Sequence, residues 1–134
     1  MTKSRVVRVS DVMELDYAIV DGVVTVAEAL TVLRERNARF LVVAKRHEDD
    51  EFGVVMTADI AKHVLALNRA PERVNIYEIM AKPVLSVKPE MDIRYCARLF
   101  HRFGISTAPV IEGDEIMGIV AYDQLVLKGL ARQP

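Results

Sequence analysis

The hydrophobic positions of the chain predict an alternation of short strands and amphipathic helices. Between residues 26 and 33 the apolar side chains recur at i, i+3, i+4 and i+7, the spacing of one helix face. Residues 40–44 form an apolar run that predicts a buried strand, and a polar segment separates them from a second run at 53–56, as in an antiparallel hairpin. A brief strand at 18–20 precedes the helix, and a further helix begins at Thr57. The predicted order is β-α-β-β-α.

The same order of elements returns in the second half of the chain. Met80 follows Met13 by 67 positions, and this offset holds along the helix before falling to 65 after the polar hairpin. A constant offset over a helix and its flanking strands, with the only change in a loop, indicates a duplicated structural unit. We therefore predict a first repeat at 7–67, a linker at 68–75 and a second repeat at 76–131.

The elements of the second repeat follow from the offset. We expect a strand at 84–87, a helix at 92–103, a hairpin of strands at 108–111 and 116–121, and a last helix at 123–130. The predicted fold class is α/β (α+β), with two β-α-β-β-α units packed about a pseudo-twofold axis. Such an axis creates two equivalent clefts where the units meet, and clefts of this kind are common ligand sites.

Composition places the chain among compact globular proteins. Of its 134 residues, 51% are hydrophobic and 28% are charged, which excludes a disordered chain and provides material for a core. The formal net charge of −1 disfavours a general attraction to nucleic acid. We expect a cytoplasmic protein, because the sequence shows no export signal and no apolar run long enough to cross a bilayer. Cys96 falls on the apolar helix face and is predicted to be a buried free thiol.

Two matching segments connect the sequence to a known family. Gly-Val-Val-Met-Thr-Ala-Asp ends at Asp59, and Gly-Ile-Val-Ala-Tyr-Asp-Gln ends at Gln124, at equivalent places in the two repeats. With these segments in register, the chain from Val9 to about Leu130 resembles a tandem pair of CBS domains, the Bateman module. The resemblance implies that an adenosine derivative (AMP, ADP, ATP or S-adenosylmethionine) binds in the cleft between the repeats. It also implies that occupancy of this cleft regulates a partner.

The resemblance assigns residues to a first ligand cleft. Asp59 matches the acid that accepts hydrogen bonds from the ribose hydroxyls in the family. Met56 stands where the family has Ser or Thr, with Thr57 one place late, which weakens the phosphate side of the site. Arg39 matches a position that often carries a phosphate-contacting basic residue. The residues that match the base slot are Tyr17 and Ala18.

The second cleft departs further from the family pattern. Gln124 replaces the ribose-binding acid, so a charge-assisted hydrogen bond is lost at a cost of about 1 kcal/mol. Ala121 replaces the hydroxyl residue, while Asp123 lies one residue too early and is expected to cap the helix. We expect one good site and one poor or empty site. The other residues assigned to the weaker cleft are Val84, Leu85, Ser106 and Thr107.

Each main candidate also has a purely structural interpretation. Asp59 can be a first-turn helix acid, which the helix dipole favours. Arg39 can pair with Glu35 at i, i+4. Thr57 is expected to cap the helix whatever else it does. The sequence leaves the first two alternatives open.

Two charged clusters carry weaker signals. Residues 47–51 hold a histidine and four acids, but they lack the spacing and the glycine of a calcium loop, so a solvated turn is predicted. His63 and His101 have no partner at metal spacing, and no metal is predicted. A basic stripe on the second repeat's long helix could meet phosphate, nucleic acid or a partner, and a solvated helix face is the simpler interpretation. The stripe consists of Arg94, Arg98, His101 and Arg102.

The sequence predicts a regulatory ligand-sensing module. It would bind an adenine nucleotide, require no cofactor and signal to a protein that the sequence does not identify, with membrane and nucleic-acid partners disfavoured. We expect no enzyme, because the chain offers no nucleophile with an identifiable base and no phosphate-binding glycine loop. The resemblance implies a homodimer through the helices, with Met13, Met80 and Met91 as adaptable contacts. The alternative is a structural or interaction module with degenerate, unoccupied ligand sites.

Overall fold

The chain folds into two compact units that do not coincide with the two sequence repeats. The computed structural model describes residues 6–132. The central unit consists of Asp16–Pro83, and the terminal unit combines the chain up to Leu15 with the chain from Val84 onward. The short segment that opens each predicted repeat therefore lies in the unit formed mainly by the other repeat.

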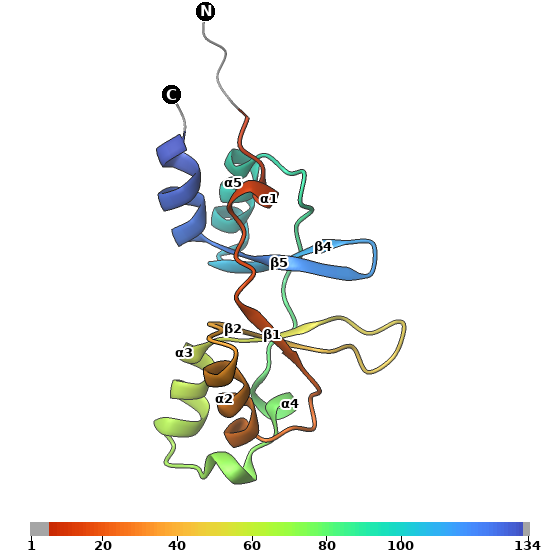
Figure 1. The fold of residues 1–134 in the computed structure, drawn as a ribbon, viewed down its shortest axis with the longest axis vertical. Helices are drawn as coiled ribbons and strands as arrows, with labels where there is room; N and C mark the ends of the chain where they lie inside the picture. The colour runs from red at the N-terminus through yellow and green to blue at the C-terminus, as the bar shows by residue number, and fades with distance from the viewer. Residues whose placement is uncertain (1–5, 133–134) are drawn as a thin grey trace, which may run out of the picture. The chain divides into compact units, whose positions relative to one another are not determined.

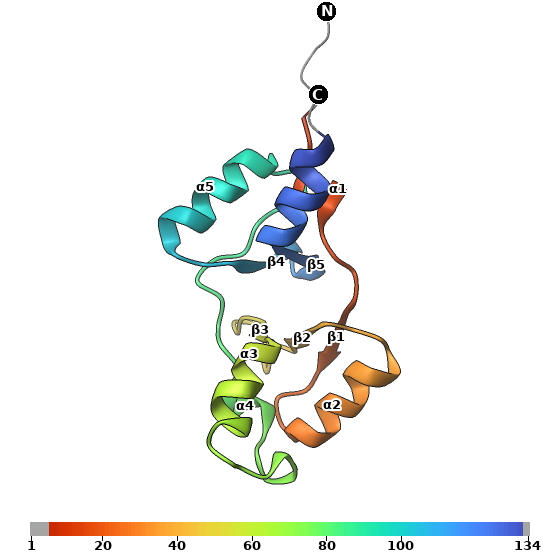
Figure 2. The same cartoon turned by 90° about the vertical axis from the view of Figure 1, so that its left-hand side faces the viewer.

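The central unit is a three-stranded mixed sheet with helices on one face. β1 runs parallel to β2, and β2 runs antiparallel to β3, as the hairpin pattern predicted. α2 and α3 lie side by side on the same face of the sheet (Figure 1, Figure 2). The elements in chain order are β1 (Tyr17–Val20), α2 (Val26–Glu35), β2 (Phe40–Val43), β3 (Gly53–Val55), α3 (Thr57–Ile60), the π-helix η1 (Ala61–Leu65), the 3₁₀-helix η2 (Pro71–Arg73) and α4 (Ile76–Ile79).

The terminal unit is built around a two-stranded sheet. β4 and β5 form an antiparallel hairpin whose tight turn contains Gly113 at a φ of 62°, a conformation that glycine adopts at little cost. The last helix, predicted at 123–130, is a π-helix that ends in a 3₁₀ turn. The elements in chain order are α1 (Val9–Val12), α5 (Ile93–Phe103), β4 (Thr107–Glu112), β5 (Glu115–Ala121), η3 (Gln124–Gly129) and η4 (Leu130–Arg132).

The strand predicted at 84–87 is not formed. Within this segment Val87 alone pairs with β4, through a parallel bridge to Val110. The cause lies in β4, where Pro109 stands at the position that Val42 holds in β2. Because proline has no N–H, it cannot donate a hydrogen bond to a neighbouring strand. The ladder that β1 makes with β2 is therefore reduced to one bridge in the terminal unit.

The exchanged opening segments pack in equivalent ways. α4 in the central unit and α1 in the terminal unit each donate a backbone hydrogen bond of 2.8 Å to the turn that precedes the long helix. Directly after these helices, Met80 lies against Gly53 and Met13 lies against Gly118. A Cβ atom on Gly53 or Gly118 would lie 2.7 or 2.9 Å from the methionine sulfur. The glycines therefore make room for the exchanged segments.

Each unit has its own hydrophobic core. Cys96 is fully buried on α5, as predicted, and burial raises the pKa of its thiol to about 11. Met13, Met80 and Met91 are half-buried and pack against the core of their own unit. A role for them in a dimer contact stays a prediction. Among the described residues, no helix is both long and apolar enough to cross a membrane.

Candidate functional site

The sheet register of the central unit brings several predicted ligand residues to one end of the sheet. Tyr17 pairs with Phe40 in the parallel ladder, and Leu41 pairs with Val55 in the antiparallel one. Arg39 precedes this row, and the residues after Val55 open α3. The starts of β1 and β2 therefore lie beside the end of β3 and the beginning of α3.

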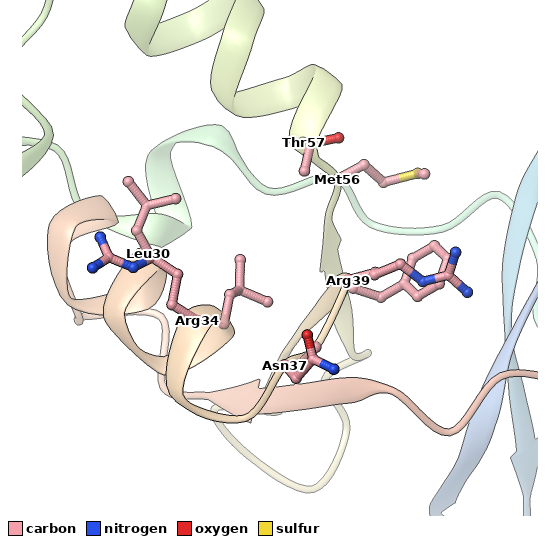
Figure 3. Close-up of a pocket in the computed structure, with 9 residues that line it drawn as sticks. Leu30, Arg34, Asn37, Arg39, Met56 and Thr57 are labelled. Carbon is pink, nitrogen blue, oxygen red and sulfur yellow. The ribbon is translucent and has the colours of Figure 1, made fainter.

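A pocket of 510 Å³ lies next to this end of the sheet, between α2 and the start of α3 (Figure 3). Its volume is within the range of small-molecule sites. Three of the predicted site residues, Arg39, Met56 and Thr57, are part of its wall. Most of the wall is apolar, and two arginines, an asparagine and a threonine supply polar groups. The lining residues are Leu30, Leu33, Arg34, Asn37, Ala38, Arg39, Phe40, Met56 and Thr57.

Arg39 is anchored beside the pocket by Asp16. Its Nε donates a hydrogen bond to Asp16 Oδ2 at 2.6 Å, and its backbone N–H donates to the Asp16 carbonyl at 2.8 Å. The guanidinium carbon lies 5.7 Å from the centroid of the Phe40 ring, a cation–π distance. The structure thus gives Arg39 an ion pair with Asp16, where the sequence had suggested Glu35. A phosphate contact by Arg39 stays a prediction.

Asp59 closes the first turn of α3. Its Oδ2 accepts a hydrogen bond from the Met56 N–H at 2.8 Å, which satisfies a free backbone donor at the helix start. The interpretation of Asp59 as a first-turn acid is therefore confirmed, while contact with a ribose stays a prediction. Thr57 does not cap the helix as expected, because Met56 is the N-cap residue and Thr57 is the first helical residue. The Thr57 side chain instead lines the pocket (Figure 3).

The residues assigned to the base slot lie outside this pocket. Ala18 is 1% exposed and belongs to the core of the central unit. Tyr17 is half-buried at the start of β1. Neither residue lines the pocket. A role for them in holding a base therefore stays a prediction.

The residues that sequence reasoning missed come from the second half of α2 and from the segment that leads from it into β2. Leu30 and Leu33 belong to the apolar stripe of this helix, and stripe residues ordinarily fill a core. Arg34 follows them in the last turn, and Asn37 lies just beyond the helix in the left-handed conformation, with a φ of 51°. The sequence feature that could have indicated Arg34 is its position one helical turn after Leu30, on the side of the helix that carries the apolar stripe.

Gln124 in the terminal unit makes the same hydrogen bond as Asp59. Its Oε1 accepts from the Ala121 N–H at 2.8 Å, and the residue is 6% exposed. Asp123, which was predicted to cap this helix, makes no side-chain cap hydrogen bond in the described structure. A neutral amide therefore accepts the backbone hydrogen bond at the start of this helix, where the central unit has a carboxylate.

An aromatic pair stands at the place in the terminal unit that corresponds to the pocket. Phe100 is equivalent to Leu33 by the 67-residue offset, and Tyr122 is equivalent to Thr57 by the 65-residue offset. Their rings pack edge to face, with centroids 5.3 Å apart and an interplanar angle of 79°. Phe100 is fully buried. Tyr122 is 38% exposed. Both rings are larger than the side chains of Leu33 and Thr57, which hold the equivalent positions in the central unit.

The other residues assigned to the weaker cleft have different environments. Leu85 packs against the terminal core, and Val84 is 65% exposed. Ser106 is exposed, while Thr107 pairs with Ala121 across the hairpin. Participation of these residues in a second ligand site stays a prediction.

The acidic turn at 47–51 is held by hydrogen bonds from Arg46 and from the distant Lys82. Asp50 accepts from the Arg46 N–H and from Lys82 Nζ, both at 2.9 Å, and these bonds, the Arg46 one foremost, lower its pKa well below the usual range. No group of three possible metal ligands occurs among residues 6–132. The turn is therefore explained as a fixed hairpin connection.

Comparison with known proteins identifies the fold. A model of the CBS domain matches residues 76–128. The hexameric CBS-CP12 protein from bloom-forming cyanobacteria is 37% identical, with a TM-score of 0.84 over 92% of this chain and 68% of that chain. The CBS domain pair of protein MJ0100, in complex with 5′-methylthioadenosine and S-adenosylmethionine, is 24% identical, with a TM-score of 0.74 over 96% and 100% of the two chains. A CBS domain protein from Pyrobaculum aerophilum complexed with AMP is 18% identical, with a TM-score of 0.73 over 93% and 99%.

A curated relative shows how the same region occurs in longer chains. Homoserine O-acetyltransferase from Methanosalsum zhilinae is 28% identical over 120 residues, which are 89% of this chain. The present chain spans 23% of the length of that protein. The solved neighbours confirm the predicted mixed α/β fold of a CBS pair. The chain belongs to the CBS domain family.

Proposed function

We propose that this protein is a regulatory module that binds an adenine nucleotide in its central unit and signals occupancy to a partner protein. The observation that carries the proposal is the 510 Å³ pocket that Arg39, Met56 and Thr57 share with α2. The ligands of two solved neighbours, AMP in one and 5′-methylthioadenosine with S-adenosylmethionine in the other, support an adenosine derivative as the ligand class.

The pocket offers the groups that a nucleotide requires. Leu30, Leu33 and Met56 supply apolar surface against which a base can be buried. Guanidinium groups in the wall can donate charge-assisted hydrogen bonds to a phosphate. The Thr57 hydroxyl can donate to, or accept from, a ribose or phosphate oxygen. These are binding groups, and we propose no catalytic step.

Signalling requires that the ligand prefer one arrangement of the protein. The pocket wall includes residues of α2 and the first residue of α3, so a ligand that contacts both would favour one spacing of these helices. A partner that contacts the helices could then distinguish the occupied from the empty protein. The regulated partner is unidentified.

We propose a second copy of the chain as one partner. The helices of the terminal unit carry large apolar side chains that are exposed, a feature of protein–protein contact surfaces. Light scattering of the purified protein should give twice the chain mass of 15.1 kDa. A monomer at micromolar concentration would contradict this part of the proposal. The exposed side chains are Tyr95, Phe103, Val126, Leu127 and Leu130.

An interaction module with unoccupied ligand sites is the second candidate function. It is favoured by Met56, which stands where the family has a hydroxyl residue, and by the aromatic pair in the terminal unit. For such a module no nucleotide should change the free energy of unfolding.

Thermal unfolding with AMP, ADP, ATP, S-adenosylmethionine and GTP separates the two candidates. A ligand at 100 times its Kd adds roughly 2.7 kcal/mol to the free energy of unfolding, a shift of several degrees in Tm. Asp59→Asn is the informative variant, because the amide keeps an acceptor for the Met56 N–H while the charge is removed. We expect an adenine-specific shift in the wild type, and a smaller shift in Asp59→Asn, whose ligand-free Tm should lie close to that of the wild type. The absence of any shift in the wild type would favour the interaction module.

A further inference from the structure

We infer that the pocket of the central unit selects a phosphorylated nucleoside over uncharged or sulfonium adenosine derivatives, and that Arg34 is the residue responsible. The inference rests on the proposed function and adds to it the charge of the ligand and the side chain that recognises it. Arg34 lies in the last turn of α2 and forms part of the pocket wall. No sequence motif had assigned it a role.

The charged residues that line the pocket are all positive. Arg34 and Arg39 are the two charged residues among the nine, and no acid is among them. Asp16 opposes the charge of Arg39 through the 2.6 Å ion pair. Within the described part of the chain, the Arg34 side chain has no ion-pair partner. The excess positive charge at the pocket therefore comes from Arg34.

The placement of the two guanidinium groups also favours Arg34. Figure 3 shows them at opposite sides of the pocket. A phosphate near Arg39 would compete with the carboxylate of Asp16, which already occupies the Nε edge. A phosphate near Arg34 meets no such competitor. Arg34 also follows Leu30 by one helical turn, so its charge adjoins the apolar wall available to a base.

The terminal unit lacks this combination of features. His101 stands at the position equivalent to Arg34, and Ser106 stands at the position equivalent to Arg39. The aromatic pair of Phe100 and Tyr122 occupies the corresponding space. A guanidinium group without a carboxylate partner therefore lies beside the pocket of the central unit, while the equivalent position of the terminal unit holds His101.

Electrostatics then ranks the adenosine derivatives. A phosphate is attracted to the guanidinium and accepts bidentate hydrogen bonds from it, whereas adenosine lacks the charged group. S-adenosylmethionine carries a sulfonium and an ammonium against a single carboxylate, so its net charge is positive and Arg34 attracts it far less than a phosphate. A hydrogen bond to a charged group at a partly exposed site corresponds to about a tenfold change in Kd. Because Arg34 is exposed, added salt should weaken the preference.

Isothermal titration calorimetry of the full chain with AMP, adenosine and S-adenosylmethionine tests the inference. Arg34→Gln removes the charge from the pocket, and Arg36→Gln is the matched control, because Arg36 is exposed, carries the same charge and does not line the pocket. The wild type should bind AMP about tenfold or more tightly than adenosine or S-adenosylmethionine. Arg34→Gln should weaken AMP binding about tenfold and change adenosine binding less than about twofold. Arg36→Gln should leave both affinities within about twofold of the wild type.

The possible results separate this inference from the proposed function. Equal affinity of the wild type for AMP and adenosine would overturn the selection and leave the proposed function standing. Equal losses of AMP affinity in Arg34→Gln and Arg36→Gln would assign the effect to net charge and overturn the role of Arg34. If neither AMP nor adenosine bound the wild type, the proposed function would fail and the inference with it. Thermal unfolding without ligand should give the same Tm for both variants, since both side chains are exposed.

Discussion

The central and terminal units have equivalent secondary-structure elements but different side chains where the long helix faces the helix after the hairpin. In the terminal unit, Phe100 and Tyr122 place two packed rings here, with centroids 5.3 Å apart. In the central unit, Leu33 and Thr57 hold the equivalent positions and border a pocket of 510 Å³. Because protein interiors are close-packed, the size of two side chains decides whether such a space becomes core or pocket. Duplication of the fold therefore need not duplicate the site.

Both units keep the same hydrogen bond at the start of the helix after the hairpin, although the accepting residue is charged in one unit and neutral in the other. Asp59 and Gln124 each accept a backbone hydrogen bond of 2.8 Å at the start of the helix that follows the hairpin. A carboxylate oxygen and an amide oxygen can both accept this hydrogen bond. An acid in this position is therefore weak evidence for a ligand unless other groups converge on the same space.

The largest expected difference between the units is the loss of unfolding free energy when Phe100 or its equivalent, Leu33, is truncated to alanine. Phe100→Ala should lower the free energy of unfolding by about 3–5 kcal/mol, because it removes a fully buried ring. Leu33→Ala should cost only about 1–2 kcal/mol, since Leu33 is half-buried and already borders open space. Denaturant unfolding measures both. Equal losses would show that the central pocket is packed as tightly as the terminal core.

Gly53 and Gly118, which lie against Met80 and Met13, give a second comparison of the two units. A Cβ on Gly118 would lie 2.9 Å from the carbonyl oxygen of Glu14, which backbone pairing holds in place. A Cβ on Gly53 would meet mainly the side chain of Met80, which can rotate away. We expect Gly118→Ala to cost about 2 kcal/mol and Gly53→Ala about 1 kcal/mol in denaturant unfolding. A larger loss for Gly53→Ala would indicate that Met80 is rigidly held.

The helix-start hydrogen bond should be worth a similar amount in both units. Asp59→Ala and Gln124→Ala each leave a backbone N–H without its acceptor, at a cost of about 1 kcal/mol. Asp59→Asn should retain most of that stability, since the amide oxygen can accept the same bond. Melting curves of the three variants measure the differences. A loss in Asp59→Asn as large as in Asp59→Ala would mean that the charge, and not the acceptor, stabilises the helix start.

The smallest expected effect lies where the two long helices end. Asn37 and Gly104 occupy equivalent positions in the left-handed region, with φ values of 51° and 66°. Gly104→Asn should cost about 0.5 kcal/mol, because asparagine tolerates this conformation and open space surrounds the site. Gly104→Ala should cost about 1 kcal/mol. If asparagine were the more costly replacement in thermal unfolding, backbone strain would not explain the glycine.

Most secondary structure could be predicted because it depends on local periodicity. The apolar stripe of α2 and the alternation of short strands with polar turns gave the elements and the antiparallel hairpin. The strand at 84–87 was wrong, because its formation depends on a residue elsewhere in the chain, Pro109 in the neighbouring strand. The exchange of opening segments is a long-range pairing that the local pattern does not contain.

The site was only partly accessible from the sequence for a similar reason. Arg39, Met56 and Thr57 could be matched to positions in a family motif, and the structure brings these three together in one pocket. Leu30 and Arg34 could not, because a stripe leucine looks the same in sequence whether it borders a core or a cavity. Which it borders depends on the volumes of side chains that meet it from other elements.

Calorimetric titration of AMP into the wild type and into the double variant Leu33→Phe/Thr57→Tyr tests the difference between the units most directly. The variant introduces into the central unit the two residue types that form the aromatic pair in the terminal unit. The account predicts one AMP per chain in the wild type and none in the variant, with cooperative unfolding retained. Two AMP molecules per wild-type chain, or unchanged AMP binding in the folded variant, would contradict it.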